Sequence, residues 1–264
     1  MHVLISSTQN PKIKSLLLLE KPRERKKHSV FVVEGKKEVT YAVEAGYTIQ
    51  NIFFCEEIVS TQAVIELKVN DRLLIPVSRE VFDKIAVRES SGGMIAVAEQ
   101  KSHRLDTIEL SKNPLVLVLE SVEKPGNLGG ILRTADAAGV DAVIICDPQT
   151  DFYNPNVIRS SVGCVFTKQI ASATTEETIG WLKKKNINIF CTYLQASKPY
   201  YETDFIAPSA IIMGTEATGL SDNWVKNATS NIIIPMQGVI DSMNVSTAAA
   251  VVIFEALRQR GFKS

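Results

Sequence analysis

Five unbroken apolar runs in the second half of the chain limit what it can fold into. Between residues 114 and 235 they read PLVLVLE, DAVIIC, INIFCTYL, SAIIMG and NIIIP, and helix-like segments such as GGILRTADAAG and TEETIGWLKKKN separate them. Strands without polar alternation are buried on both faces, which is typical of a parallel sheet covered by helices. Ligands bind such sheets at the carboxyl ends of the strands, so the loops after Glu120, Gly214 and Pro235 are expected to hold a site.

The N-terminal third also alternates between strand and helix signals. VFVVEG, IQNIFFC, LLIPVS and MIAVAEQ are predicted strands, and KKEVTYAVEAG and REVFDKIA are predicted helices. An earlier helix is expected to begin at Asn10 and Pro11, whereas the basic stretch KPRERKKHS is predicted to be a loop. Residues 101–113 show neither the helical nor the strand periodicity of apolar residues, so we place a domain boundary there and expect two domains, 1–105 and 106–264. A chain of 264 residues with 45% hydrophobic residues is long enough for two cores.

Charge is distributed unevenly although the formal net charge is zero. The first 37 residues hold nine basic side chains and three acidic ones. Clustered positive charge favours an anionic partner such as a phosphate backbone, but a solvated surface would explain it equally well. Cys55, Cys146, Cys164 and Cys191 lie far apart, so we expect reduced, buried thiols and no zinc site. Without a long apolar run or a signal-peptide core, the chain is expected to be cytoplasmic and not membrane-bound.

Two loops carry glycines beside polar residues. The first, residues 120–139, contains Asn127 and Arg133 but fits neither the GxGxxG pattern nor a phosphate-binding P-loop. Asn127 as a helix cap and Arg133 paired with Asp136 would explain this loop without any ligand. The second, residues 211–225, places Glu216 between two glycines, where it either binds a ligand or is solvated. Ser221 is expected to cap the helix that follows.

The third loop lies within residues 231–261. Ser242, Asn244 and Ser246 stand at the start of a long Ala-rich helix, and capping explains one such residue more easily than three. That helix is predicted to end at RQRG, with Gly261 just beyond its last turn.

Together, the three loops resemble the three motifs of SpoU-family RNA methyltransferases. NLGGILRTA, GTEATGLS and IPMQGVIDSMNVSTA match in the order that the family shows, and the resemblance covers residues 114–261. The one departure is Met243 where leucine is usual, a near-isosteric change. FVVEGKKEVTYAVEAGYTIQNIFF also resembles the substrate-binding domain of many family members, a ribosomal-protein-like α/β module.

The resemblance implies a mostly parallel SPOUT domain with a C-terminal trefoil knot, which pairs into a homodimer through the knot and the last helix. It also implies transfer of a methyl group from S-adenosylmethionine, without a metal, to a ribose 2'-hydroxyl of RNA. Ribosomal RNA is the preferred substrate; transfer RNA, or an inactive RNA-binding homologue, is the alternative. A small-molecule enzyme on a doubly wound sheet is a further alternative, although the nucleotide motifs GxGxxG and GK[ST] are missing.

Residue roles also follow from the resemblance. The polar site residues would be Asn127, Arg133, Glu216, Ser242 and Asn244. The cofactor would be held at Gly214, Ile234 and Met243, with Met236 and Leu220 as apolar neighbours. The family's arginine is often assigned as the general base, but a guanidinium stays protonated near pH 7. We therefore expect Arg133 to clamp the target phosphate and to stabilise the developing alkoxide.

Overall fold

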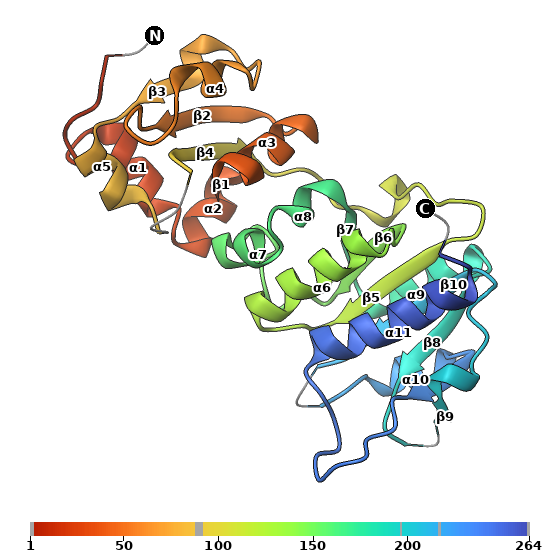
Figure 1. The fold of residues 1–264 in the computed structure, drawn as a ribbon. Coiled ribbons are helices and arrows are strands. Elements are labelled where there is room, and N and C mark those ends of the chain that lie inside the picture. The colour runs from red at the N-terminus through yellow and green to blue at the C-terminus, as the bar shows by residue number, and fades with distance from the viewer. Residues whose placement is uncertain (1–2, 88–91, 196, 216–217, 263–264) are drawn as a thin grey trace. The chain divides into compact units, whose positions relative to one another are not determined.

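A computed structural model describes residues 3–87, 92–195, 197–215 and 218–262 (Figure 1). The chain forms two compact units. The first consists of residues 1–102 and 151–167, and the second of residues 103–150 and 168–264. The break after Ser102 lies close to the boundary expected near residue 105, but the sequence did not suggest that residues 151–167 would join the first unit. The assignment of separate tasks to the two domains stays a prediction.

The first unit is built on a four-stranded sheet in the order β1-β4-β2-β3. β4 runs antiparallel to β1 and β2, and β2 runs parallel to β3. The strands are β1 (Val30–Glu34), β2 (Ile49–Phe54), β3 (Leu74–Pro76) and β4 (Met94–Glu99). The helices are α1 (Pro11–Leu18), α2 (Pro22–His28), α3 (Lys36–Glu44), α4 (Thr61–Ile65), α5 (Arg79–Ile85), α7 (Pro155–Ser160) and α8 (Cys164–Thr167).

The start of α1 agrees with the prediction, because the Asn10 side chain accepts a hydrogen bond from the backbone of Lys12 ahead of Pro11. The loop predicted for KPRERKKHS is wrong, since these residues form α2. Pro22 fits the first turn of this helix, and Glu24 lies 3.8 Å from the Lys27 ammonium and 3.7 Å from a ring nitrogen of His28, one turn on. A dense run of charges looked like a loop, but arginine, lysine and glutamate are good helix formers.

Both faces of the first sheet are covered. On one face, alternate strand residues such as Val30, Phe53 and Ile95 pack with Ile13 of α1 and Phe82 of α5. On the other face, α3 packs against β1 and β4. Phe31 stacks there on Tyr153, with ring centroids 4.2 Å apart, and on Phe166. Residues 151–167 therefore complete the hydrophobic packing of the first unit.

A buried arginine ties this segment to α2. Arg25 is 1% exposed, and its Nε and Nη2 donate to one carboxylate oxygen of Asp151 at 3.2 and 3.0 Å. Its Nη1 donates to the carbonyls of Leu19 and Glu20 at 3.0 and 2.9 Å. The guanidinium thus joins three stretches of chain, two of them close in sequence and one more than a hundred residues away.

Replacing Arg25 should therefore destabilise the first unit. Arg25→Ala leaves two carbonyls and the Asp151 carboxylate without their donor, which we expect to cost about 3 kcal/mol of unfolding free energy. Urea unfolding, followed by fluorescence, measures the loss. Arg23→Ala, an exposed neighbour on the same helix, should change stability by less than about 0.5 kcal/mol. Equal effects of the two substitutions would show that the buried contacts contribute nothing.

The second unit is built on a seven-stranded sheet in the order β7-β6-β5-β10-β8-β11-β9, and every neighbouring pair is parallel. The strands are β5 (Leu115–Glu120), β6 (Ala142–Cys146), β7 (Gln169–Ala173), β8 (Asn188–Thr192), β9 (Lys198–Pro199), β10 (Ser209–Met213) and β11 (Ser230–Ile233). The helices are α6 (Pro125–Ala137), α9 (Thr175–Lys184), α10 (Asp222–Asn227) and α11 (Val245–Gln259).

Helices cover both faces of this sheet, as the apolar runs predicted. Val116 and Val118 of β5 pack in one core with Leu182 of α9 and Trp224 of α10. The alternate residues of β5, Leu117 among them, are equally buried and face the other side, where α11 packs against α6 and β10. All five predicted strands are present. β7 and β9 carry little strand signal in the sequence, because QIASA has few large apolar residues and β9 is only two residues long.

α11 ends as predicted, with Gly261 in the left-handed region (φ +81°) after the last turn. Among the described residues, no helix combines the length and the apolar character that crossing a membrane would require. The trefoil knot stays a prediction.

Candidate functional site

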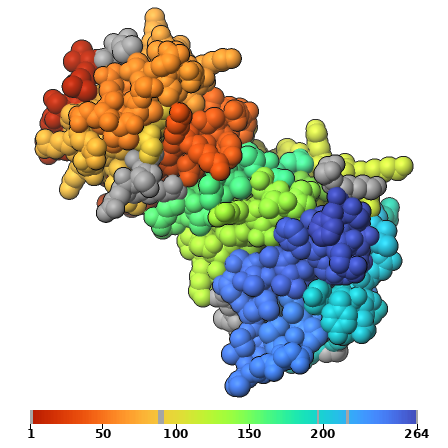
Figure 2. All heavy atoms as spheres, in the orientation of Figure 1, coloured from red at the N-terminus to blue at the C-terminus, as the bar shows by residue number. Residues whose placement is uncertain are grey.

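A cavity of about 750 Å³ lies in the second unit, at the carboxyl ends of β8, β10 and β11. Four short segments build its wall. The first is residues 192–195 at the end of β8, and the second is residues 213–215 and 218–219 at the end of β10. The third is residues 232–236 around the end of β11, and the fourth is residues 241–248 at the start of α11. The parallel sheet thus places its cavity at the edge where ligands bind such folds. The loop between β11 and α11, blue in Figure 2, lies at the surface of this unit.

Most of the predicted site residues meet at this cavity. Those lining it are Gly214, Ile234, Met236, Ser242, Met243 and Asn244. Leu220 does not line it but is buried in the core beside Trp224. Glu216 lies outside the described residues.

Asn127, from the first motif, reaches the third motif through a side-chain hydrogen bond. Asn244 Nδ2 donates to Asn127 Oδ1 at 3.0 Å, across 117 positions of sequence. The Asn244 Oδ1 accepts from the backbone of Ser246 at 3.0 Å, so Asn244 caps α11. α6 and α11 pack against each other here, and a Cβ on Gly130 of α6 would make an ordinary contact of 3.4 Å with the Ser246 side chain. The two motifs therefore form one polar surface.

Capping by Asn127 is excluded, because α6 begins at Pro125 with Lys124 in the cap position. The alternative explanation of Arg133, a pairing with Asp136, is not observed either. Asp136 lies 3.8 Å from the ammonium of Lys168, and Arg133 makes no ion pair with any residue that the structure describes. Arg133 is exposed on α6, so its guanidinium is accessible to an anionic ligand.

The loop after β10 is a tight reversal. Thr215 and Gly219 exchange two backbone hydrogen bonds of 3.2 and 3.1 Å, and the Thr215 hydroxyl accepts from the backbone of Thr218 at 2.9 Å. Gly219 has a φ of +69°. A Cβ on Gly214 would lie 2.6 Å from the backbone nitrogen of Leu220. Glycine is therefore required at residue 214 for the chain to fold back on itself.

Glu120, close to this loop, was not predicted from the sequence to contribute to the site. Glu120 ends the otherwise apolar β5, is only 7% exposed, accepts two hydrogen bonds from Ser221, and lies 3.2 Å from the Thr175 hydroxyl. An acid that closes a buried strand was the available signal. Ser221 stands at the cap position of α10 as predicted, but its side chain makes no capping hydrogen bond.

The cysteines of β6 and β8, the strands on either side of β5 and β10, are not reactive thiolates. All four cysteines are free and buried, as expected. Burial raises the pKa of the Cys146 thiol to about 12, and burial together with the Glu120 charge raises the pKa of Cys191 to about 12. Neither side chain is a thiolate at neutral pH. In the described part of the chain, no group of three or more histidine, cysteine, aspartate or glutamate side chains is arranged to hold a metal ion.

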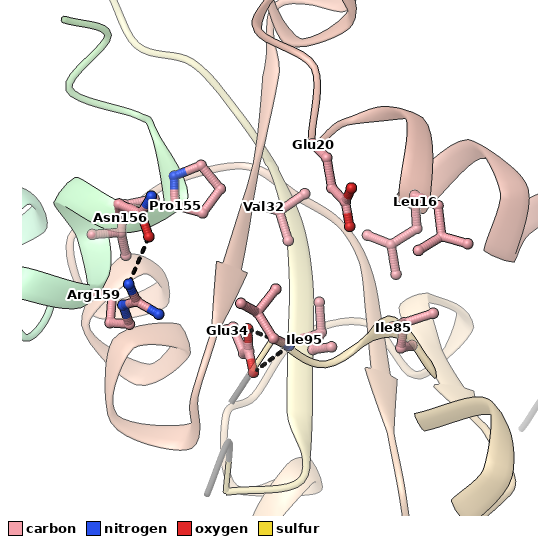
Figure 3. Close-up of a pocket in the computed structure, with 12 residues that line it drawn as sticks. Leu16, Glu20, Val32, Glu34, Ile85, Ile95, Pro155, Asn156 and Arg159 are labelled. Carbon is pink, nitrogen blue, oxygen red and sulfur yellow. Dashed lines mark hydrogen bonds between the residues drawn. The ribbon is translucent and has the colours of Figure 1, made fainter. Parts of the chain in front are cut away.

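The first unit has a much smaller hollow of about 50 Å³ (Figure 3). Figure 3 shows apolar side chains such as Leu16, Val32 and Ile95 along it, with Glu34 and Arg159 at its border. The Glu34 carboxylate accepts from the backbone of Val87 at 3.1 and 3.2 Å. This volume suits a few water molecules and not a nucleoside, so the hollow is not a second candidate site.

Comparison with known proteins agrees with this geometry. Residues 114–254 match the SpoU rRNA Methylase family, and residues 10–96 match an MRM3-like substrate binding domain. The 23S rRNA methyltransferase RlmP of Bacillus subtilis is 29% identical over 95% of this chain and 97% of its own length. A crystal structure of an RNA 2'-O ribose methyltransferase is 37% identical, with a TM-score of 0.84 over 98% of this chain and 99% of the other.

The AdoMet-bound rRNA methyltransferase from Sinorhizobium meliloti is 30% identical, with a TM-score of 0.89 and 97% of each chain covered. Fold and site together therefore define a methyltransferase class, an α/β protein whose cavity is built by loops at the carboxyl edge of a parallel sheet. More specifically, the chain belongs to the SpoU rRNA methylase family.

Alanine is expected to change the unfolding free energy in opposite directions at Gly214, in the tight loop after β10, and at Gly180, in α9. Gly214→Ala forces a Cβ against backbone atoms and should lower the unfolding free energy by about 2 kcal/mol or more. Gly180→Ala, on the exposed face of α9 with open space around it, should raise the unfolding free energy by about 0.5–1 kcal/mol. Urea unfolding of both variants provides the comparison. A neutral Gly214→Ala variant would contradict the close approach.

Proposed function

We propose that this protein transfers a methyl group from S-adenosylmethionine to a ribose 2'-hydroxyl of ribosomal RNA. The observation that carries the proposal is the cavity, which the second and third motifs line and the first motif joins through Asn127. The relatives support the same chemistry. RlmP is named as a 23S rRNA guanosine 2'-O-methyltransferase, and the protein from Sinorhizobium meliloti is described as an AdoMet-bound rRNA methyltransferase.

The residues around the cavity fit such a cofactor. Its volume of about 750 Å³ falls in the range that ligand pockets occupy. Apolar side chains, Met236 and Met243 among them, suit an adenine ring and a thioether-like chain, while backbone groups at Gly214 and Ile234 provide hydrogen bonds. Leu220 would support this wall from the core side.

The cofactor, when bound, supplies an electrophilic methyl group attached to a positively charged sulfur. The chain itself must hold the ribose hydroxyl in line, help to remove its proton, stabilise the negative charge that develops on the oxygen, and keep competing water out. Asn127, Ser242 and Asn244 are the polar groups proposed to orient the hydroxyl, with Glu216 added by the motif. The exposed guanidinium of Arg133 is proposed to bind the neighbouring phosphate with two hydrogen bonds and to stabilise the alkoxide.

We assign RNA binding to residues 1–105 and methyl transfer to residues 106–264. Arg23, Lys26 and Lys27 are exposed on α2, which supports a phosphate-binding surface in the domain that matches a substrate-binding family. Residues 151–167, although they fall in the range assigned to methyl transfer, pack in the first unit and help to form its core.

We propose a homodimer that pairs through α11 and the C-terminal region in which the trefoil knot is predicted. Phe254 is 42% exposed on this helix, which supports an apolar contact. Two alanines of α11 already have other contacts within the chain, since Ala249 is buried in the core and Ala248 lines the cavity. A cytoplasmic location accords with an RNA substrate and stays a prediction.

Methyl transfer can be tested with RNA from cells that lack the gene. The purified protein and labelled S-adenosylmethionine should mark one ribose in ribosomal RNA, and the linkage after it should resist alkali, because a methylated 2' oxygen cannot attack its phosphate. Transfer RNA from the same cells serves as the comparison. Label on a base would refute the assigned nucleophile, label in transfer RNA alone would refute the substrate, and no label in either RNA would favour an inactive binding protein.

Replacing Arg133 tests its proposed role. Arg133→Ala should lower the rate of methyl transfer on the order of 10²- to 10³-fold while the affinity for S-adenosylmethionine stays nearly unchanged. Arg133→Lys should also lose much of the activity, since lysine keeps the charge but not the planar pair of donors. Single-turnover kinetics and calorimetric titration separate the two quantities.

Arg104→Lys, at an exposed arginine that pairs with Asp106, is the matched control and should keep full activity. Full activity of Arg133→Lys would exclude the two-bond clamp. Loss of cofactor binding in Arg133→Ala would mean that the residue supports the cofactor site instead.

A further inference from the structure

Glu120 is an acidic side chain in an otherwise apolar setting. It is the last residue of β5, and the five residues before it are all buried and apolar. Only 7% of Glu120 is exposed. Burying a carboxylate is costly unless hydrogen bonds replace its water shell, so its partners show what it holds in place.

Its main partner is Ser221, which lies 101 positions further along the chain. The backbone N–H of Ser221 donates to Glu120 Oε2 at 2.8 Å, and the Ser221 hydroxyl donates to Oε1 at 2.6 Å. Both distances are short and typical of hydrogen bonds to a charged acceptor. One carboxylate therefore holds both the backbone and the side chain of a single residue.

This contact uses a group that could otherwise stabilise a helix. Ser221 precedes α10 at the position where serine usually caps, yet its hydroxyl makes no capping hydrogen bond and instead lies 2.6 Å from Glu120 Oε1, to which it donates. The local gain from capping is given up for a long-range contact. The Ser221 side chain is thus directed to the distant Glu120 and not to the first turn of the six-residue helix.

Ser221 ends the loop that begins at Gly214. The start of this loop is fixed by β10, since Met213 pairs with Leu119 in the sheet. Its middle is closed by the two hydrogen bonds between Thr215 and Gly219, both of which line the cavity. Glu120, one residue after Leu119, fixes the end. Both ends of the loop are thus anchored beside the last two residues of β5.

We propose that Glu120 is a positioning residue for the S-adenosylmethionine site, which holds Ser221 in place and so fixes the neighbouring Thr218 and Gly219 in the wall of the cavity. It acts through Ser221 and is not itself among the residues that line the cavity. The proposal rests on the proposed function for the identity of the ligand.

A second contact of Glu120 supplies the control. The Thr175 hydroxyl lies 3.2 Å from Glu120 Oε1 and 2.8 Å from a carboxylate oxygen of Asp147, which also accepts from the Thr175 backbone at 3.2 Å. One hydroxyl proton serves one carboxylate at a time, and the shorter distance favours Asp147. Thr175→Val therefore removes a contact from the Glu120 region and leaves the loop anchor intact.

The test compares Glu120→Ala, Glu120→Gln, Ser221→Ala and Thr175→Val in the full-length protein, with S-adenosylmethionine titrated by calorimetry. Losing a buried hydrogen bond to a charged group should raise Kd about 10-fold in Ser221→Ala and more in Glu120→Ala. Glu120→Gln should stay within about threefold of the unsubstituted protein, because its amide oxygen still accepts from Ser221 and its amino group can donate to the hydroxyls. RNA affinity should not change in any variant.

Hydrogen exchange gives a readout that does not require the ligand. The Ser221 amide should exchange slowly in the unsubstituted protein and in Thr175→Val, and at least 10-fold faster in Glu120→Ala. If Glu120→Ala does not fold, Ser221→Ala and Glu120→Gln still carry the comparison through cofactor affinity.

An unchanged Kd in Ser221→Ala, or an equal loss in Thr175→Val, would overturn the proposal, because Glu120 would then act through general packing. An unsubstituted protein that binds no S-adenosylmethionine contradicts the proposed function, whereas the exchange rate of the Ser221 amide still decides whether Glu120 anchors the loop.

Discussion

The parallel pairing of β5 with β10 is the contact on which the candidate site depends. These strands are more than ninety positions apart in sequence, and their pairing from Ser209–Leu115 to Met213–Leu119 brings Glu120 beside Gly214. β8 and β11 follow on the other side of β10, so their loops open at the same edge. Because every strand runs in the same direction, loops that are scattered in the sequence become the walls of one cavity.

Helix packing, and not strand pairing, brings the first motif to the third. α6 and α11 lie against each other, and Gly130 of α6 lies beside Ser246 of α11. The hydrogen bond between Asn127 and Asn244 depends on this approach. The polar groups of the first motif therefore reach the third through helix contact, while the second motif is placed by strand pairing and by the Glu120 anchor.

The sequence allowed the strands of both sheets to be predicted largely from local pattern, since runs such as PLVLVLE are buried on both faces. The loops of the site were also predicted, because glycines and polar residues follow strand ends. Local pattern failed where a distant partner decides the outcome. The charged residues of α2 look solvated until Arg25 is seen to be buried against Asp151, and Glu120 looks like an ordinary strand end until Ser221 is beside it.

The segment 151–167 has a consequence for how such proteins can be recombined. The chain passes between its two units after Ser102, after Thr150 and after Thr167, so the first unit is not one continuous stretch of sequence. A transferred fragment that ends at residue 102 would leave Arg25 without Asp151 and Phe31 without Tyr153. Exchange of the N-terminal domain between family members is therefore restricted to partners whose corresponding segment offers the same acid and the same ring.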